Sequence, residues 1–455
     1  MAGDPELADA VRRLFALWGL GVPGTASGPA GEHAGSGQQR SEGAGERPPA
    51  NGTAPTSRSK AAAAASGHGD DGVLGSRAAL PLLRSGSPVW KPALAQEASA
   101  LRQSLAGVDP RKFERALERR LGRRLGRFMD GVSAYRRHPY RRNLTDPPIL
   151  WREGTTQLLD YGGAGPPLLV IPSLVNRAYI LDLSERQSLL RHLAKAGFRT
   201  LLVDWDRPGA LERDFTLTDY IAGRLESALE AAIESVGAPV GVIGYCMGGL
   251  LALALAQRRR REVGALALLA TPWDFRSAGS ALTASMPLMA PAVAWWLEFL
   301  GCLPTDALQS LFYGLDPFLV IRKFQRFAGL DPASPEAEAF VALEDWLNDG
   351  VPLAGPVARE CLLGWYGANT AAAGQWRIAG RAVLPELIQC PSLVVVPGRD
   401  RIVPPASALA LADGLKQATR LQPPLGHIGM VVGGSAPERL WTPLTQWLAR
   451  HLGKA

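Results

Sequence analysis

Short apolar runs alternate with helical stretches after residue 150, and this rhythm restricts the fold more than any other feature of the sequence. The predicted strands are Pro167–Ser173, Arg199–Trp205, Val240–Gly244, Gly264–Ala270, Ser392–Pro397 and Arg420–Gln422. Helices are predicted between them at about 185–196, 217–236 and 247–260. Apolar strands separated by helices favour a mostly parallel sheet that is covered on both faces. The expected fold class is therefore α/β.

The strand rhythm stops between residues 274 and 387. This long segment contains Trp295, Trp296, Trp346, Trp365 and Trp376. Because strand signals resume after it, we predict a mainly helical cap at about 276–385, inserted into a sheet domain that covers 151–455.

The first 150 residues have a different composition. Residues 1–20 predict a short amphipathic helix capped by Asp4, with Leu7, Val11 and Leu14 on one stripe. Residues 21–88 are dominated by Gly, Ala, Ser and Pro, and we predict a disordered linker because they offer little apolar surface to bury. A helical arm is expected at 89–150, with a break at Asp109-Pro110.

The arm concentrates the positive charge of the chain. Residues 111–142 hold 12 lysines and arginines against 3 acidic residues, in a chain whose net charge is +7. Such a patch either attracts anionic partners or is simply a solvated face. No nucleic-acid-binding motif accompanies it, so nucleic acid is not an expected partner.

The cysteines and the apolar segments predict a reducing, cytoplasmic setting. The four cysteines are scattered without the CxxC spacing typical of metal or redox sites, and no signal-sequence pattern is present at the N-terminus. Residues 277–297 form a long uncharged run, but Pro287 and Pro291 interrupt it, so a membrane span is not expected. No metal site is predicted.

The segment Gly244-Tyr-Cys-Met-Gly248 lies between a predicted buried strand and a predicted helix. A Gly-x-nucleophile-x-Gly sequence in this context is typical of a nucleophile elbow, in which the turn is so tight that small residues flank the nucleophile. The helix N-terminus favours a thiolate. Cys246 is therefore the predicted nucleophile, and the alternative is a buried structural cysteine.

His427 and Asp400 are the predicted partners of Cys246. Five other histidines lie in less suitable places: His33 and His68 in the linker, His138 in the arm, His192 in a helix and His451 at the end. His427 follows the last predicted strand, and Asp400 follows the strand before it. The order Cys246, Asp400, His427 matches nucleophile, acid and histidine in the α/β hydrolases. Asp274 is a second carboxylate near the same sheet edge, for which a structural or hinge role is favoured over an accessory one.

An oxyanion hole needs two backbone N–H groups directed at the acyl oxygen. The residue after the nucleophile, Met247, is predicted to supply one. The loop after the third strand of the sheet, Ser173 to Asn176, is predicted to supply the other through Leu174 or Val175.

Four segments resemble the polyhydroxyalkanoate synthases of the α/β-hydrolase fold: Pro172–Leu183, Gly244–Gly249, Gly398–Pro404 and Gly426–Gly429. The resemblance covers residues 165–450. It implies that Cys246 carries the acyl group, that His427 is its base, and that Asp400 orients His427 or activates the incoming hydroxyl. It also implies that the enzyme polymerises 3-hydroxyacyl-CoA into polyhydroxyalkanoate with release of CoA, which is part of the substrate, and that no cofactor is needed.

The residues around Ala342–Trp346, and onward to Tyr366, resemble the short-subunit type of this family. This implies a second, dissimilar subunit, with a homodimer as the alternative, and a location at cytoplasmic polymer granules. Two other functions stay open. One is hydrolysis by an acyl-CoA thioesterase or an intracellular polyhydroxyalkanoate depolymerase, and the other is a non-catalytic granule-associated protein.

Overall fold

The computed structural model describes residues 81, 83–85, 94–236, 239–277, 281–316 and 318–453. The helix predicted at 1–20 lies outside the described residues, as does nearly all of the linker predicted at 21–88. The predicted arm is described from residue 94 onward.

An eight-stranded sheet forms the centre of the described chain, in the order β1-β2-β6-β3-β7-β8-β13-β14. The strands are β1 (Ile149–Glu153), β2 (Thr156–Asp160), β3 (Pro167–Ile171), β6 (Arg199–Asp204), β7 (Val240–Tyr245), β8 (Val263–Leu269), β13 (Ser392–Val395) and β14 (Ala418–Leu421). β1 and β2 are antiparallel to their neighbours, and the other pairs are parallel. The predicted α/β class is confirmed, whereas the β1–β2 hairpin was not foreseen.

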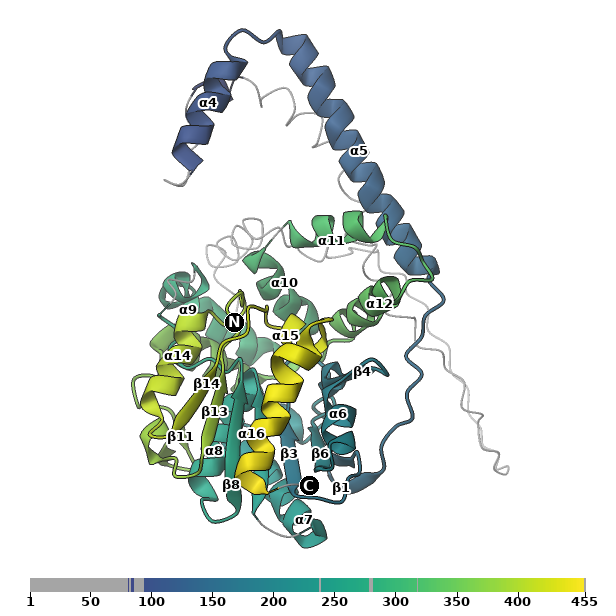
Figure 1. Ribbon diagram of the computed structural model, residues 1–455. Coiled ribbons are helices and arrows are strands. Elements are labelled where there is room, and N and C mark those ends of the chain that lie inside the picture. The colour runs from purple at the N-terminus through teal and green to yellow at the C-terminus, as the bar shows by residue number, and fades with distance from the viewer. Residues whose placement is uncertain are drawn as a thin grey trace, which may run out of the picture.

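Helices cover both faces of this sheet (Figure 1). On one face lie the π-helix η5 (Asp219–Leu225), α7 (Glu226–Val236), α8 (Met247–Arg258) and α14 (Pro405–Gly414). On the other lie α6 (Leu189–Lys195), α15 (Gly429–Val432), the π-helix η8 (Pro437–Trp441) and α16 (Thr442–Leu452). Alternate residues of β3 point to opposite faces: Leu169 and Ile171 join the first core, and Leu168 and Val170 the second. This alternation follows from the period of two in a strand.

Short elements connect the first half of the sheet. They are the 3-10 turn η3 (Ala178–Leu181), the small hairpin β4 (Asp182–Ser184) and β5 (Gln187–Ser188), and the 3-10 turn η4 (Glu212–Asp214). Asp182, the first residue of β4, is fully buried and pairs with Arg142 and Arg191. The ion pair with Arg142 links the segment that follows α5 to the sheet domain.

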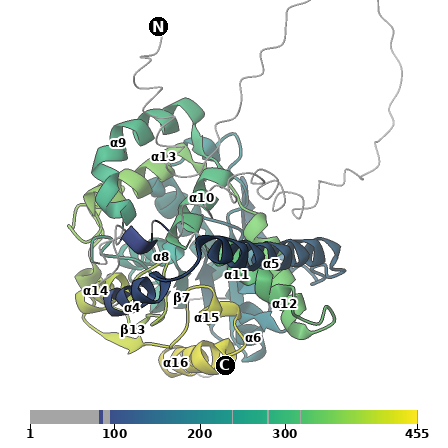
Figure 2. The ribbon, with the colours of Figure 1, turned by 90° about the horizontal axis from the view of Figure 1, so that it is seen from above.

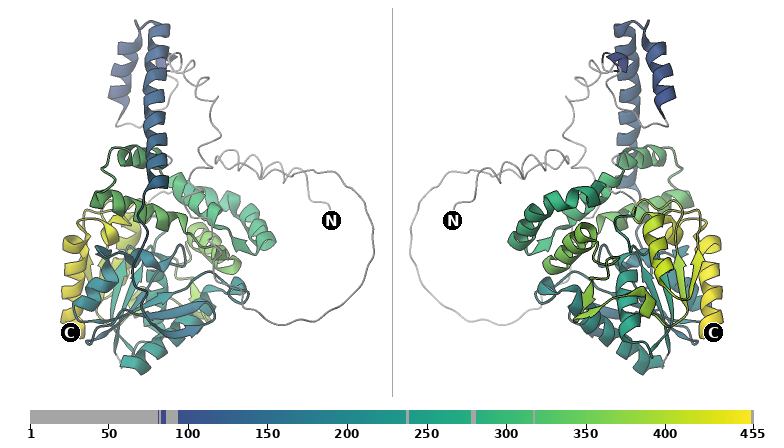
Figure 3. Two further views of the ribbon diagram at one scale, coloured as in Figure 1. Left: turned by 90° about the vertical axis from the view of Figure 1, so that its right-hand side faces the viewer. Right: turned by 90° about the vertical axis from the view of Figure 1, so that its left-hand side faces the viewer.

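A mainly helical insert separates β8 from β13. It contains α9 (Ala281–Leu300), β9 (Cys302–Leu303), α10 (Thr305–Leu315), α11 (Leu319–Phe327), α12 (Pro335–Asn348), β10 (Leu353–Ala354), α13 (Gly355–Arg359), the π-helix η6 (Glu360–Ala368), β11 (Arg377–Ile378), β12 (Arg381–Ala382) and the turn η7 (Pro385–Leu387). The helices α9 to α12 lie over the end of the sheet toward which the parallel strands run (Figures 1 and 3). The extent of the cap stays a prediction.

The basic arm consists of α4 (Ala95–Leu105) and α5 (Pro110–Arg137). The Asp109 side chain accepts a hydrogen bond from the Lys112 N–H at 2.8 Å and so caps α5, and Pro110 occupies its first turn. Figures 1 and 3 show α5 projecting from the sheet domain, with only its C-terminal part against the insert, and in Figure 2, which looks down from above, α5 overlies α11. There it packs on α11, so closely that a Cβ at Gly131 would lie 2.0 Å from the Phe324 carbonyl oxygen.

None of the described helices is both long enough and apolar enough to cross a membrane.

Candidate active site

Cys246 connects β7 to α8 in a strained turn. Its φ is 55° and its ψ is −126°, a backbone conformation that residues with a Cβ rarely adopt. The sharp turn ends the strand and starts the helix within one residue, so that the side chain stands at the N-terminus of α8. This is the elbow that the sequence predicts.

Three glycines allow this turn to form. A Cβ at Gly244 would lie 2.5 Å from the Gly249 Cα, and one at Gly248 would lie 2.2 Å from the Ile171 carbonyl oxygen. A Cβ at Gly249 would come within 1.8 Å of the Thr271 hydroxyl. The first two glycines belong to the predicted motif, while the need for Gly249 depends on its approach to Thr271 and was not foreseen.

His427 and Asp400 form a buried pair. The His427 Nδ1–H donates to Asp400 Oδ2 at 2.7 Å, and the two residues are only 8% and 6% exposed. The other carboxylate oxygen, Oδ1, accepts the backbone N–H groups of Ile402 at 2.8 Å and Val403 at 2.9 Å. Because both oxygens have partners, the carboxylate is fixed and determines which ring nitrogen of His427 carries the proton.

The second ring nitrogen of His427 is left for Cys246. Burial alone would lower the pKa of His427, but the negative charge of Cys246 and hydrogen bonds to Asp400 and Cys246 outweigh it and raise the pKa to about 10. The structure thus brings Cys246, Asp400 and His427 together, in the arrangement of a nucleophile, a base and an orienting acid.

The two predicted oxyanion-hole donors of the Ser173–Asn176 loop differ in their surroundings. The Val175 N–H donates to the Ser173 hydroxyl at 3.0 Å, whereas Leu174 is buried beside it. Met247 is the first residue of α8, where backbone N–H groups have no partner within the helix. Because the Val175 N–H is already used by Ser173, Leu174 is favoured as the donor that acts with the Met247 N–H. This role stays a prediction.

Comparison with known proteins identifies the family. Residues 166–433 match the family model of the alpha/beta hydrolase fold. The chain is 31% identical over 296 residues to the poly(3-hydroxyalkanoate) polymerase subunit PhaC of Synechocystis sp., a match that covers 63% of this chain and 78% of that protein. The chain belongs to the poly(3-hydroxyalkanoate) polymerase subunit family.

Two further members of the family give similar matches. The subunit PhaC of Allochromatium vinosum is 30% identical over 287 residues, which are 62% of this chain and 80% of that protein. The subunit PhaC of Haloarcula marismortui is 29% identical over 291 residues, which are 63% of this chain. That match spans 61% of the Haloarcula protein, which is less than two thirds of its length.

Tyr245 is a site residue of this polymerase-family chain that the sequence did not single out. Its hydroxyl donates to the His427 carbonyl oxygen at 3.2 Å, and the two rings lie 5.3 Å apart. Tyr245 precedes the nucleophile, so it links the elbow to the loop that carries the histidine. The place of Tyr245 beside Gly244 can be seen in the sequence. Its hydrogen bond to His427, which lies far away in the chain, cannot.

Asp274 joins the start of the insert to the segment that follows η6. Its Oδ1 accepts the Asn369 side-chain amide at 2.9 Å and the Arg276 N–H at 2.9 Å. The Asn369 side-chain oxygen in turn accepts the Phe275 N–H at 3.0 Å. These bonds clasp the chain entering the insert to the chain leaving η6, which supports the structural role favoured for Asp274.

Aromatic residues from both sides of this clasp pack near the nucleophile. Phe275 contacts the ring of Tyr366 at 4.8 Å, and Trp365 packs edge-on against Trp376 at 5.3 Å. Burial, followed by the negative charges of Cys246 and Cys361, raises the pKa of Tyr366. The insert therefore contributes apolar surface close to Cys246.

The other cysteines have different surroundings. All four cysteines are unpaired thiols. Burial raises the pKa of Cys390 to about 11, and the pKa of Cys361 is raised well above its ordinary value, chiefly by burial. Within the described ranges, no group of three or more His, Cys, Asp or Glu side chains could hold a metal ion.

Proposed function

We propose that this chain is an acyltransferase that polymerises 3-hydroxyacyl units from their CoA thioesters, with Cys246 as the acyl carrier. The observation that supports this most strongly is the buried Asp400–His427 pair, whose free ring nitrogen contacts Cys246 at the elbow. The relatives named above, which are called poly(3-hydroxyalkanoate) polymerase subunits, support the polymer product.

In the first step the Cys246 sulfur attacks the thioester carbonyl carbon. The carbon–sulfur bond to CoA breaks, and the protonated His427 gives its proton to the departing CoA sulfur. Met247 and Leu174 N–H groups stabilise the oxygen on which negative charge develops. Because one thioester replaces another, this step is nearly balanced in energy.

In the second step a 3-hydroxyl group of another hydroxyacyl unit attacks the Cys246 thioester. His427 takes the hydroxyl proton, an ester bond forms, and the Cys246 sulfur is released for the next cycle. Both oxygens of Asp400 are occupied by His427, Ile402 and Val403, which favours orientation of His427 over direct activation of the hydroxyl.

Water must be kept from the acylated cysteine for polymer to form. The aromatic cluster of Phe275, Trp365, Tyr366 and Trp376 supplies apolar surface beside the site and supports acyl transfer over hydrolysis. A thioesterase would use the same three residues and differ in admitting water at the second step.

The proposal extends to partners and location. The outer face of α9 exposes Leu288, Trp295 and Phe299, at 88%, 52% and 74%. Exposed apolar surface of this kind is typical of interaction sites and supports contact with a second subunit, a second copy of the chain or the polymer granule. We place the enzyme in the cytoplasm, at such granules.

Incubation of the purified chain with 3-hydroxybutyryl-CoA tests the proposal. We expect CoA release together with insoluble polyester, and a loss of at least about 10³-fold in both for Cys246→Ala, because the substitution removes the proposed acyl carrier. Cys390→Ala, which removes a partly buried thiol outside the elbow, is expected to keep at least half of the rate.

Chromatographic product analysis decides between the outcomes. CoA release with only free hydroxy acid, both with the chain alone and after supplying a dissimilar subunit, would identify a hydrolase. An unchanged rate in Cys246→Ala would exclude Cys246 as nucleophile.

A further inference from the structure

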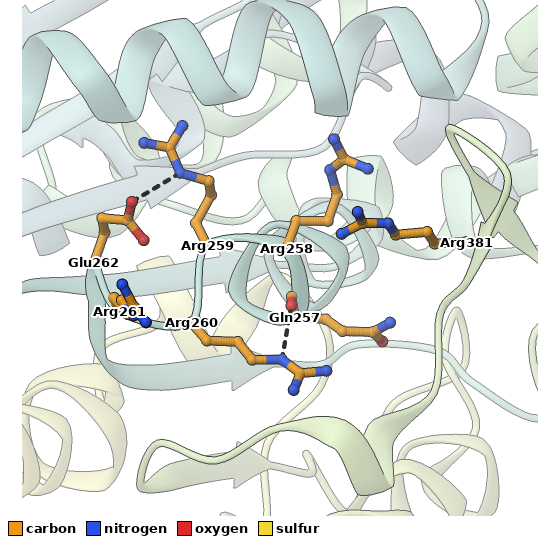
Figure 4. Close-up of a pocket in the computed structure, with 7 residues that line it drawn as sticks. All are labelled: Gln257, Arg258, Arg259, Arg260, Arg261, Glu262 and Arg381. Atoms are coloured by element: carbon orange, nitrogen blue, oxygen red, sulfur yellow. Dashed lines mark hydrogen bonds and ion pairs between the residues drawn. The ribbon is translucent and has the colours of Figure 1, made fainter.

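Arginines line a surface hollow at the C-terminal end of α8, the end opposite to Cys246. The hollow has a volume of about 500 Å³ and is lined by Gln257, the four consecutive arginines at 258–261, Glu262 and Arg381 (Figure 4). We call it the arginine hollow. Since α8 has 12 residues and rises about 1.5 Å per residue, roughly 18 Å of helix separates it from the nucleophile.

Two of the arginines are already neutralised. Arg258 pairs with Glu226, and its guanidinium also approaches the Ile378 carbonyl oxygen. Arg259 pairs with Glu230 at 2.7 Å and with Glu262 at 3.2 Å. Glu262 supplies the only carboxylate of the lining, so its charge is used by Arg259 and is not available to the other arginines.

The three remaining arginines lack such partners. In the part of the chain that the structure describes, no ion pair involves Arg260, Arg261 or Arg381. All three are exposed. The Arg260 Nε–H donates to the Gln257 carbonyl oxygen at 3.1 Å, which fixes the base of the guanidinium and leaves its two terminal amino groups free to donate.

Arg381 reaches the hollow because Gln257 holds the hairpin that carries it. The Gln257 side-chain amide donates to the Ala382 carbonyl oxygen at 2.7 Å, and its oxygen accepts the Leu384 N–H at 2.8 Å. Figure 4 shows the Arg381 side chain extending from this segment toward the end of α8. The positive groups are thus assembled by a specific contact between segments more than 100 residues apart in sequence.

A second hollow of about 300 Å³ continues the basic region. It shares Arg260 with the first and adds Lys416, with Glu386 as its only carboxylate. Like charges that line one hollow repel one another, and an anion bound between them reduces this repulsion. The excess of positive charge therefore favours an anionic ligand over an empty surface.

We propose that the arginine hollow binds a small molecule bearing two or more linked phosphate groups, such as a nucleoside triphosphate. The guanidinium fork matches phosphate oxygens, and three unpaired arginines match a polyphosphate better than a single carboxylate or phosphate. A volume of about 500 Å³ suits a small ligand. The site is separate from Cys246 and does not rest on the proposed acyl transfer.

Calorimetric titration of the full chain with ATP, tripolyphosphate and orthophosphate tests this site. We expect saturable binding of one ATP or tripolyphosphate per chain, with orthophosphate at least tenfold weaker. Arg260→Ala and Arg381→Ala should each raise the Kd for tripolyphosphate about tenfold, because each removes a charge-assisted contact. These side chains are exposed, so both variants should fold, and circular dichroism checks this.

Arg119→Ala is the matched control, because it removes one exposed positive charge from α5 without touching the hollow. Its Kd should stay within twofold of the unchanged chain. Equal weakening in Arg119→Ala, equal affinity for orthophosphate and tripolyphosphate, or no saturable binding at millimolar ligand would each overturn the proposal. Tighter binding of a DNA duplex than of tripolyphosphate would do the same.

Discussion

Helix α8 has opposite surroundings at its two ends. At its N-terminus Cys246 lies among glycines and buried side chains, and the nearby charged pair, Asp400 and His427, is almost hidden from solvent. At its C-terminus the arginines of the hollow are half-buried or exposed and only partly paired. The N-terminal end combines close packing with a buried charged pair, whereas the C-terminal end carries partly exposed ion pairs and unpaired arginines, so substitutions at the two ends should have effects of different size.

Replacing the acid should have the largest effect, and only at the N-terminal end. Asp400→Asn keeps the size of the side chain but removes the negative charge that accepts the His427 Nδ1–H. We expect the rate of CoA release to fall by about 10² to 10⁴, as for other acids that orient a catalytic histidine. Glu226→Gln, which removes a carboxylate at the other end of α8, should change the rate less than about twofold. A similar loss of rate in Asp400→Asn and Glu226→Gln would contradict this difference between the two ends of α8.

Close packing at the elbow can be tested through stability. Gly249→Ala places a Cβ 1.8 Å from the Thr271 hydroxyl, so we expect the free energy of unfolding to drop by about 3 kcal/mol or more, as measured by urea denaturation. Gly126→Ala in α5 is the control, because nothing lies within 4 Å of a Cβ there. That change should stabilise the helix by about 0.5–1 kcal/mol. A Gly249→Ala variant with unchanged stability would show that α8 and Thr271 can move apart without cost.

The coupling between Cys246 and His427 predicts a shift in titration. In Cys246→Ala the pKa of His427 should fall from about 10, because two of the contributions that raise it disappear while burial still lowers it. The imidazole NMR signal would report this pKa. A His427 pKa that is unchanged in Cys246→Ala would show that Asp400 alone sustains it.

The same pKa predicts how stability depends on pH. The pKa of His427 lies above its ordinary value of 6.5, so its stabilising contribution is complete below about pH 6.5 and is lost as the pH rises toward about 10. Thermal unfolding across this range should show the loss, and in Cys246→Ala the loss should occur at lower pH.

Tyr245→Phe should have the smallest effect. The substitution removes the hydrogen bond to the His427 carbonyl oxygen but keeps the ring that packs on His427. A cost of about 0.5–1.5 kcal/mol in unfolding free energy and a few-fold loss of rate are expected. Tyr313→Phe, on the half-exposed surface of α10, is the control and should change neither quantity. Equal stability and equal rate in the two variants would show that the Tyr245 hydroxyl does not contribute to the site.

Local patterns in the sequence were sufficient to predict the α/β class and to single out Cys246, Asp400 and His427. Strand and helix periods show where each residue leaves the sheet, and parallel strands bring those ends to one edge. The approach of Gly249 to Thr271, the clasp of Asp274 with Asn369 and the contact of Gln257 with the Arg381 hairpin were not predictable in this way. Each joins segments that are distant in sequence, and no local period encodes such a pairing.

The anchoring of α5 on α11 has a geometric consequence for the arm. Its 28 residues form one continuous helix that is about 42 Å long, held at its C-terminal end where Gly131 meets Phe324. The orientation of every arginine around the axis of the projecting part is therefore fixed relative to the sheet domain. One extra residue inserted before Gly131 would rotate the arginine-bearing face by about 100° about the helix axis. Seven extra residues would return this face almost to its original orientation and would only make the helix longer.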